Sequence, residues 1–308
     1  MNKIIFLGYG EYGVSTLSGL IQSDYQVILI LTHPSKRGAI NPVLDLAQKH
    51  EIEHYFSSQL VEKEIVETIV KMEPDFIVST NWRYRIPSKI LRIPKIAALN
   101  VHDSLLPNYA GLSAEYWVIR NNEKQTGVTV HIMSDIMDAG PIVLQESVLI
   151  NNDDTSFDVA RKQLRVYPKI IIEALTEFSN PGFTPKLKEL KEYKRYHRIT
   201  KRDRRIQWEK SPQEIYNMFR AHRDPTPNCF FLWKNKKFWI KSLAYSDCSY
   251  CGEPGRVVTH LDEGVGVVTG SGVLDSHYRS GIILKQVSNE MNCFLDPKNI
   301  FPIDAQLD

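Results

Sequence analysis

The first 100 residues alternate between short, fully apolar runs and amphipathic stretches, and this alternation constrains the fold more than any other feature. The apolar runs lie at residues 4–7, 27–31, 76–79 and 97–100. Stretches 14–22 and 42–50 between them carry apolar residues at helical spacing. Strands that are apolar on both faces and separated by helices form a parallel sheet that is covered on both sides. The pattern therefore predicts a doubly wound α/β domain.

The residues after this region have a different pattern. Two β-rich runs, 126–133 and 140–149, are joined by a loop that carries Asp138. Residues 154–178 then have the length and apolar spacing of a long closing helix. We therefore expect Asp138 to lie on a loop between two strands.

A break in the pattern divides the chain. Residues 179–205 contain an Asn-Pro-Gly sequence and a lysine-rich segment without a regular apolar period, which indicates a linker. At 308 residues, the chain has the usual length of two domains. We expect a first domain at residues 1–185, a linker at 186–205 and a second domain at 206–308.

The second domain is expected to be smaller and rich in β-strands. Ser211-Pro-Gln-Glu214 predicts a helix start, because Ser suits the N-cap, Pro the first helical position and Glu the third. Short β runs follow, separated by Gly, Asp, Asn and Pro, at residues 229–233, 238–243, 256–259, 265–269 and 282–287. This order is typical of a small OB-like barrel or a sandwich.

The charge balance excludes two broad classes of protein. The chain has 38 basic and 36 acidic residues, a net charge of +2, which fits neither a general nucleic-acid binder nor a membrane-surface protein. No apolar run approaches the roughly 20 residues of a membrane span, and Met1-Asn-Lys leads directly into an expected strand. We expect a cytoplasmic protein without a signal peptide or a membrane partner.

The four cysteines are too few and too clustered for a secreted disulfide framework, and we expect reduced thiols. Cys248-Ser-Tyr-Cys251 has the spacing of zinc ligands, and Cys229 and Cys293 could complete a four-cysteine site. A second pair with this spacing is missing from the sequence. We therefore expect no metal.

The sequence Gly8-Tyr-Gly10-Glu-Tyr-Gly13 lies after the first expected strand, where a dinucleotide-binding fingerprint would stand. Such a site needs an acidic residue at the end of the second strand, which here reads Leu31-Thr-His-Pro34. The missing carboxylate favours a structural turn or a phosphate-approach role over a redox cofactor.

Asn100 and His102 stand at the end of a strand expected in the centre of the sheet, at the edge where open α/β sheets bind ligands. Residues two apart on a strand point to the same face, so both side chains should enter one crevice. Asp138-Ala-Gly140 follows on a neighbouring connection. An amide, an imidazole and a carboxylate are the groups needed to move an acyl group onto an amine, so the sequence points to an enzyme.

Three motifs in this order carry a family resemblance: Asn100-Val-His102-Asp-Ser-Leu-Leu-Pro107, Thr126-Gly-Val-Thr129 and Asp138-Ala-Gly140. The set resembles the signature of the N10-formyltetrahydrofolate-dependent formyltransferases. This family includes enzymes that formylate methionyl-tRNA, glycinamide ribonucleotide and nucleotide-linked amino sugars. The resemblance implies a Rossmann-like catalytic domain and N10-formyltetrahydrofolate as co-substrate.

Further segments extend the resemblance over nearly the whole chain. Thr32-His-Pro34, Asp75-Phe-Ile77 and Arg83-Tyr-Arg-Ile-Pro87 are similar to the sugar-modifying branch. Ile206-Gln-Trp208 and Arg220-Ala-His-Arg-Asp-Pro-Thr-Pro227 match the C-terminal domain of the family.

The resemblance implies a catalytic triad of Asn100, His102 and Asp138. Asn100 would donate to the oxyanion that forms when an amine attacks the formyl carbon, a contribution of roughly 3 kcal/mol in acyl transfer. His102 would shuttle a proton from the attacking nitrogen to the leaving folate nitrogen. An ionised Asp138 would favour the imidazolium form and hold the ring.

The folate pocket of the family is formed by two loops. Carried over by position, its residues here are Tyr84, Arg85, Ile86, Ser134, Asp135, Ile136 and Met137. Contacts in this pocket are largely through backbone groups. From the residues themselves, Trp82 and Tyr84 are the aromatic candidates for ligand contact beside the crevice.

The expected acceptor is the primary amine of a nucleotide-linked amino deoxysugar, as in surface glycan precursor synthesis. Methionyl-tRNA is the alternative, but the stretch 33–43, which is long and basic in the tRNA enzyme, is short here and holds only Lys36 and Arg37. The basic segment 186–205 would suit nucleic acid, yet acidic residues are mixed into it. These features disfavour a nucleic-acid partner.

Some features leave alternatives open. Many relatives have an Arg-Gly pair where this chain reads Ala110-Gly111, so a folate-tail or acceptor contact can differ. A non-catalytic folate- or nucleotide-binding protein is a second alternative, against which the intact triad argues. The C-terminal domain could bind substrate, form a homodimer or brace the catalytic domain. The sequence identifies neither the sugar nor its nucleotide.

Overall fold

The computed structural model describes residues 1–34, 41–56, 62–186, 194–223, 225–270 and 280–308. The chain forms two compact units by its internal contacts. The N-terminal unit consists of Met1–Ala114, Gln125–Leu149 and Ala160–His197. The C-terminal unit consists of Glu115–Lys124, Ile150–Val159 and Arg198–Asp308. The expected domain boundaries at residues 185 and 206 stay a proposal.

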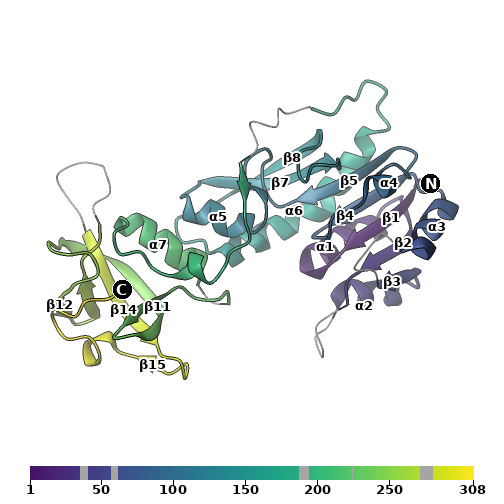
Figure 1. Cartoon of the computed structure of the whole chain (residues 1–308). Coiled ribbons are helices and arrows are strands. Elements are labelled where there is room, and N and C mark those ends of the chain that lie inside the picture. Colours follow the sequence, from purple (N-terminus) through teal and green to yellow (C-terminus); the bar gives the residue numbers. More distant parts are fainter. Residues whose placement is uncertain (35–40, 57–61, 187–193, 224, 271–279) are drawn as a thin grey trace. The chain divides into compact units, whose positions relative to one another are not determined.

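The N-terminal unit is built on a seven-stranded sheet in the order β3-β2-β1-β4-β5-β7-β8 (Figure 1). Its parallel strands are β1 (Lys3–Gly8), β2 (Gln26–Thr32), β3 (His54–Phe56), β4 (Phe76–Thr80) and β5 (Ala97–His102). The antiparallel strands are β7 (Gln125–Ile132) and β8 (Ile142–Leu149). The strand order reverses at β1 and β4, which confirms the expected doubly wound, mainly parallel fold.

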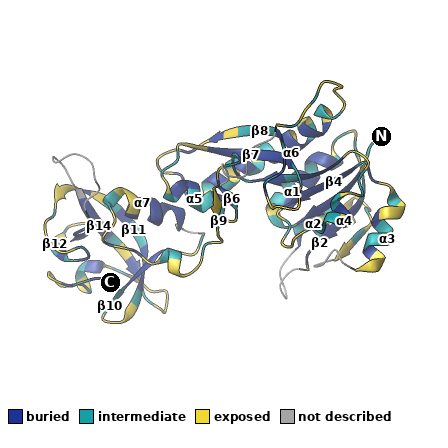
Figure 2. Cartoon of the chain, turned by 45° about the horizontal axis from the view of Figure 1, so that its top comes forward, coloured by how far each residue is buried: buried dark blue, intermediate teal, exposed yellow. Residues whose placement is uncertain are grey.

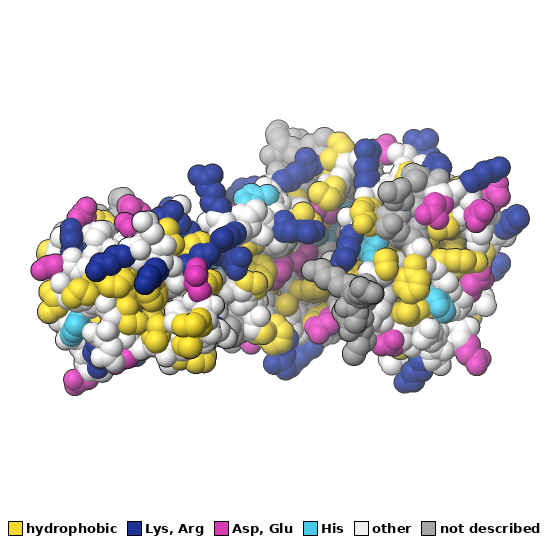
Figure 3. All heavy atoms as spheres, turned by 60° about the horizontal axis from the view of Figure 1, so that its bottom comes forward, with side chains coloured by type: hydrophobic (Ala, Val, Ile, Leu, Met, Phe, Trp, Pro, Cys, Tyr) yellow, Lys and Arg dark blue, Asp and Glu magenta, His cyan; other side chains and the backbone are white. Residues whose placement is uncertain are grey.

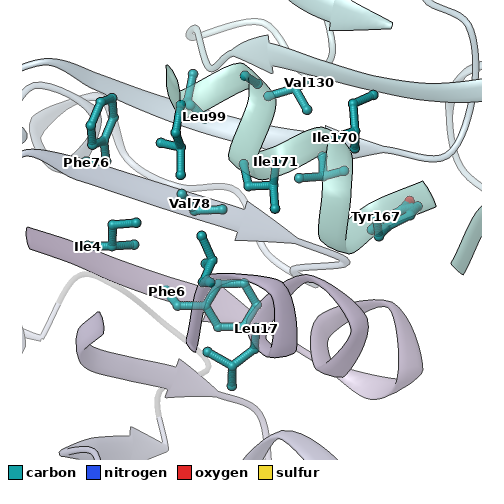
Figure 4. Packing of buried hydrophobic residues seen from close by; sticks show 14 of the residues in the cluster. Ile4, Phe6, Leu17, Phe76, Val78, Leu99, Val130, Tyr167, Ile170 and Ile171 are labelled. Atoms are coloured by element: carbon teal, nitrogen blue, oxygen red, sulfur yellow. The ribbon is translucent and has the colours of Figure 1, made fainter. Parts of the chain in front are cut away.

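Helices cover both faces of this sheet, as the fully apolar strands require. They are α1 (Gly10–Ile21), α2 (Pro42–Lys49), α3 (Lys63–Met72), α4 (Ser88–Leu91) and α6 (Ser156–Glu177). On one face, Phe6 packs in a cluster with Leu17 of α1 and Ile170 of α6 (Figure 4). On the other face, Leu7 packs with Ile69 of α3. The central strands β1 and β4 are accordingly buried along most of their length (Figure 2).

The expected long helix is confirmed as α6, but β3, α3 and α4 were not predicted. Strand β3 is only three residues long, and its Tyr55 and Phe56 are exposed, so it lacks a buried apolar run. Helix α4 has a single turn, which is too short to produce a readable period.

The C-terminal unit holds an antiparallel sheet in the order β10-β11-β14-β13-β12, with β15 paired to β14. Its strands are β10 (Phe230–Trp233), β11 (Lys236–Ser249), β12 (Val257–Leu261), β13 (Gly264–Val267), β14 (Ser280–Ser288) and β15 (Phe294–Leu295). Short 3-10 helices lie at Arg202–Arg204 and Pro297–Asn299. Trp208, Phe231 and Phe301 fill its core. The expectation of a smaller, β-rich second domain is confirmed.

Helix α7 (Pro212–Ala221) begins as the sequence predicts. The backbone N–H of Glu214 donates to Ser211 Oγ at 3.2 Å, and Ser211 N–H donates to the Glu214 carboxylate at 3.0 Å. The two contacts form a capping box that satisfies otherwise unpaired helix N–H groups.

Two segments from the first half of the chain belong to the C-terminal unit: most of α5 (Ala114–Arg120) and the first turn of α6. Arg120 Nη1 donates to the backbone oxygen of Asp203 at 2.8 Å. Ser156 Oγ donates to the backbone oxygen of Ala221 at 2.7 Å. These side chains pair with distant backbone groups, which residue patterns along the sequence do not reveal.

Candidate active site

Asn100 lies on β5 directly opposite His131 on the antiparallel strand β7. Asn100 Nδ2 is 3.1 Å from His131 Nε2, and His131 Nδ1 is 3.0 Å from the backbone oxygen of Ile132. A carbonyl oxygen only accepts, so Nδ1 carries the ring proton. Burial lowers the pKa of His131 to about 4, against the attraction of Asp138, so the ring is neutral. Nε2 therefore accepts from the Asn100 amide and fixes its orientation.

His102 ends β5 and is almost fully buried. Its Nε2 donates to the backbone oxygen of Tyr109 at 3.1 Å, and its Nδ1 lies 3.4 Å from Asp103 Oδ1 and 3.9 Å from Asp138 Oδ1. Burial lowers the pKa of His102, but Asp138, Asp103 and the Tyr109 carbonyl outweigh it and raise that pKa above 6.5. Both ring nitrogens face acceptors, which favours the imidazolium form.

Asp138 lies on the loop between β7 and β8, as expected. Its backbone is left-handed, with φ at 58°, and the side chain is only 8% exposed. A Cβ atom on Gly140 would collide with the backbone oxygen of Ile132, so glycine is required where the loop turns back onto β7. The Asp-Ala-Gly sequence is thus explained by the close approach of this loop to the strand.

The Asp138 carboxylate connects the site. Oδ2 accepts from the backbone N–H of Gly111 at 2.8 Å. Oδ1 lies 3.8 Å from His131 Nε2 and 3.9 Å from His102 Nδ1. The structure therefore brings Asn100, His102 and Asp138 together, with His131 between the amide and the carboxylate. Their catalytic roles stay proposals.

The motifs around Ser104 and Thr129 hold the turn that follows β5. Thr129 Oγ1 donates to the backbone oxygen of Ser104 at 2.6 Å and accepts from the backbone N–H of Leu106 at 3.1 Å. Gln145 Nε2 donates at 2.8 Å to both Thr129 Oγ1 and the backbone oxygen of Leu106. One threonine thus ties the two motifs together across neighbouring strands.

The two loops proposed to contact folate lie side by side. Arg85 Nη2 donates to the backbone oxygen of Asp135 at 3.3 Å, and Ser88 Oγ donates to the Asp135 carboxylate. Ser134 Oγ donates to the backbone oxygen of Ile136 at 2.9 Å. The large apolar side chains that these loops expose are Tyr84, Ile136 and Met137. Ile86, in contrast, is half-buried against the core, so its side chain serves packing.

A cluster of aromatic side chains lies after β2 and β4, and the sequence analysis missed its central residue, His33. The His33 ring lies 4.0 Å from Trp82 and 5.1 Å from Tyr84, measured between ring centroids. Its Nε2 accepts from the Arg83 backbone N–H at 3.2 Å, and burial with the nearby Arg83 charge lowers its pKa to about 4. Trp82 and Tyr84, which are expected to contact ligand, thus pack against a neutral, buried imidazole.

The glycine-rich turn before α1 has a packing role. Gly10 has φ at 64°, and a Cβ on Gly13 would stand 3.0 Å from Val43 Cγ2 of α2. Glycine at these positions allows the turn and the close packing of the two helices. This geometry fits the expected structural role.

Cys229 is buried in the core of the C-terminal unit, while Cys248, Cys251 and Cys293 are exposed free thiols. Among the described residues, no group of three or more His, Cys, Asp or Glu side chains is placed to hold a metal ion. Within the same residues, no helix is long and apolar enough to cross a membrane. Lys36, Arg37 and segment 187–193 of the expected linker lie outside the described residues.

Comparison with known families decides the assignment. The model of the formyl transferase family matches residues 2–175, and that of the formyl transferase C-terminal domain matches residues 198–290. The chain belongs to the formyl transferase family. It is therefore an N-formyltransferase, which confirms the resemblance noted in its sequence. The match covers both the α/β and the β-rich parts of this formyl transferase.

The curated relatives of this chain carry the names of different proteins. A methionyl-tRNA formyltransferase of Lactobacillus johnsonii is 31% identical over 78% of each chain. The bifunctional polymyxin resistance protein ArnA of Wigglesworthia glossinidia brevipalpis is 32% identical over 83% of this formyl transferase, which matches 40% of ArnA.

Solved structures share the fold of this formyl transferase at low identity. The N-formyltransferase of Helicobacter canadensis, in complex with folinic acid and dTDP-3-aminofucose, has a TM-score of 0.65 at 19% identity. The alignment covers 92% of this chain and 99% of that enzyme. HypX of Aquifex aeolicus with tetrahydrofolic acid has a TM-score of 0.57 at 18% identity, and the chain spans 46% of its length.

Proposed function

We propose that this enzyme transfers the formyl group of N10-formyltetrahydrofolate to the primary amine of a nucleotide-linked amino deoxysugar, as in surface glycan precursor synthesis. The contact network of Asn100, His102 and Asp138 carries the chemical part of this proposal. For the acceptor, the proposal rests mainly on the low positive charge of the chain and the short stretch 33–43 with only two cations. The fold shared over 92% of the chain with an N-formyltransferase whose structure holds dTDP-3-aminofucose supports it.

The exposed side chains of the paired loops fit the proposed folate site. Tyr84, Ile136 and Met137 are 50%, 43% and 60% exposed, on loops held together by the Arg85–Asp135 contact. An aromatic and two apolar side chains left in solvent suit the faces of a flat ring system. N10-formyltetrahydrofolate, when bound, supplies the formyl group.

Asn100 has the geometry of an oxyanion donor. One amide N–H is used by His131, so the second N–H remains to donate to the formyl oxygen as negative charge develops there. A preorganised donor of this kind contributes about 3 kcal/mol in acyl transfer. The His131 contact prevents the amide from turning its oxygen toward that charge.

His102 acts first as an acid in this proposal. Its raised pKa favours the protonated ring, which can give a proton to the leaving folate nitrogen. The neutral ring then accepts a proton from the attacking amine. Asp138 stabilises the imidazolium form, which is present before the first transfer and is restored by the second.

Formylation of methionyl-tRNA is the second candidate function, and the 31% identity to the Lactobacillus johnsonii enzyme favours it. The near-neutral charge of the chain argues against tRNA as the acceptor, because binding to a nucleic-acid backbone needs clustered Lys and Arg. In the face drawn in Figure 3, acidic side chains are interspersed among the basic ones. A third interpretation, a non-catalytic folate- or nucleotide-binding protein, conflicts with family membership and with the complete site.

An endpoint mass-spectrometric assay tests the proposal. Purified protein is given N10-formyltetrahydrofolate with UDP- and dTDP-linked 3-amino and 4-amino deoxysugars, and separately with charged initiator methionyl-tRNA. We expect a gain of one formyl group on a nucleotide sugar and its loss in His102→Ala. Formylation of the tRNA alone would reject the sugar acceptor.

A further inference from the structure

A two-residue strand from a distant part of the N-terminal unit lies along the loop that follows His102. Strand β9 (Arg195–Tyr196) pairs in parallel with β6 (Ala110–Gly111). The backbone N–H of Leu112 donates to the Tyr196 oxygen at 3.1 Å, and the N–H of Lys194 donates to the Pro107 oxygen at 3.2 Å. The loop from 107 to 112 is therefore held at both ends by residues 194–196.

Side chains reinforce this pairing. The rings of Tyr109 and Tyr196 are stacked, with centroids 4.8 Å apart and planes inclined by 15°. Gly111 has φ at 104°, and a Cβ there would collide with the Tyr196 backbone oxygen. So short a strand pair has little stability of its own, so the ring stack and the glycine contact are needed to keep it in place.

The loop held in this way touches two groups of the active site through its backbone. The Tyr109 oxygen accepts from His102 Nε2 at 3.1 Å, and the Gly111 N–H donates to Asp138 Oδ2 at 2.8 Å. A change in the path of residues 109–111 would alter both contacts together. The stack of Tyr109 on Tyr196 thus acts on the proposed acid His102 and its partner Asp138 through the backbone of residues 109–111.

We propose that Tyr196 is a positioning residue, which stacks on Tyr109 and so holds the backbone that orients His102 and Asp138 for formyl transfer. This inference rests on the proposed roles of His102 and Asp138. It adds a residue that is distant from His102 in the sequence and lies outside the motifs that carry the family resemblance.

The pKa of His102 can be measured to test this role. A general loss of stability would leave this pKa unchanged in the protein that remains folded. The groups facing its ring are Asp138, Asp103, the neutral His131 and the Tyr109 carbonyl. Among the causes that set the pKa of His102, burial lowers it and the two carboxylates and the Tyr109 carbonyl raise it. If the loop moves, both the carbonyl contact and the burial of the ring change, so the pKa of His102 shifts.

The test compares Tyr196→Leu, which removes the stack but keeps an apolar side chain, with Tyr196→Phe, which keeps the ring. His102 is titrated by NMR in the full-length protein, with its signals assigned by their loss in His102→Ala. Turnover is measured with N10-formyltetrahydrofolate and dTDP-3-aminofucose. Thermal unfolding is recorded for each variant as a separate measure of stability.

We expect Tyr196→Phe to match the parent protein. In Tyr196→Leu, the pKa of His102 should shift and kcat should drop by roughly 10-fold to 100-fold, with a smaller change in KM for the folate. A folded Tyr196→Leu protein with an unchanged His102 titration would overturn the proposal. Because NMR needs no acceptor, this outcome stays distinct from a failure to formylate the sugar.

Gly111→Ala disturbs the pairing of β6 with β9 from the β6 side. It replaces Tyr196→Leu as the test variant if Tyr196→Leu does not fold. Its new Cβ would push the Tyr196 backbone away. A shift in the pKa of His102 is again expected, and an unshifted titration in folded Gly111→Ala protein would contradict the proposal.

Discussion

Asn100 and His131 face each other across β5 and β7, with Nδ2 and Nε2 3.1 Å apart. The neutral imidazole, held by its own contact to the Ile132 carbonyl, offers only a lone pair to the amide. This pairing decides which end of the Asn100 side chain points into the site. The proposed oxyanion donor is thus oriented by a residue outside the predicted triad.

Replacing His131 should therefore weaken catalysis through Asn100. In His131→Ala, the amide is free to rotate, and we expect kcat to fall by up to about 100-fold with little change in KM for the folate. His131→Gln supplies another acceptor and should restore part of the loss. Steady-state kinetics check both variants, and equal activity of His131→Ala and the parent enzyme would reject the role.

Asp138→Asn should change how stability depends on pH. The pKa of His102 is raised above 6.5 in the folded state, so its contribution to stability is complete below pH 6.5 and is lost as pH rises through the raised value. Without the Asp138 charge, the pKa of His102 falls, and this pH dependence should flatten. Denaturant unfolding at a series of pH values above 6 measures it.

Asp135→Asn is the matched control for that experiment, because its carboxylate contacts Ser88 at the start of α4 instead of His102. We expect it to keep the pH dependence of the parent protein. If the free energy of unfolding of Asp138→Asn depends on pH as it does in Asp135→Asn and in the parent protein, Asp138 does not raise the pKa of His102.

Gly140→Ala should destabilise the protein and reduce activity. The added Cβ meets the Ile132 backbone oxygen, so the loop that carries Asp138 must shift away from β7. Overpacking of this kind typically costs about 1–3 kcal/mol in the free energy of unfolding. Gly182→Ala is the control, since its Cβ would have only the Asn180 side chain nearby, at 3.6 Å. Equal effects of the two substitutions on unfolding would contradict the account.

Arg85→Ala should weaken folate binding more than it slows turnover. The guanidinium joins the two loops through the Asp135 carbonyl, and without it the exposed side chains of those loops are held less firmly. Fluorescence titration with folinic acid should show a Kd raised by about 10-fold, which corresponds to about 1.4 kcal/mol. Arg92→Ala, at the end of α4, should leave the Kd unchanged. An unaltered Kd in Arg85→Ala would show that the contact between Arg85 and Asp135 does not support folate binding.

The sequence alone predicted the parallel sheet and placed Asn100, His102 and Asp138 near one another, because strand ends and residue spacing along a strand are local properties. His131 was missed although Thr126-Gly-Val-Thr129 stands just before it. Its importance comes from its register opposite Asn100, and a sequence does not show which residues of two antiparallel strands face each other.

Contacts between distant segments were likewise hidden from the sequence. Tyr196 meets Tyr109 through strands of two residues each, which are too short to leave an apolar pattern. Arg120 and Ser156 join the C-terminal unit through backbone oxygens, and a backbone acceptor has no sequence signature.

Competition between acceptors distinguishes a nucleotide-linked amino sugar from methionyl-tRNA as the proposed substrate of this formyl transferase. Enzyme, N10-formyltetrahydrofolate with a labelled formyl group, dTDP-3-aminofucose and charged initiator methionyl-tRNA are combined with both acceptors at equal concentration. The initial rate of label transfer to each is then measured. We predict label on the nucleotide sugar and background levels on the tRNA, with both lost in His102→Ala. Label on the tRNA and none on the sugar would contradict the account.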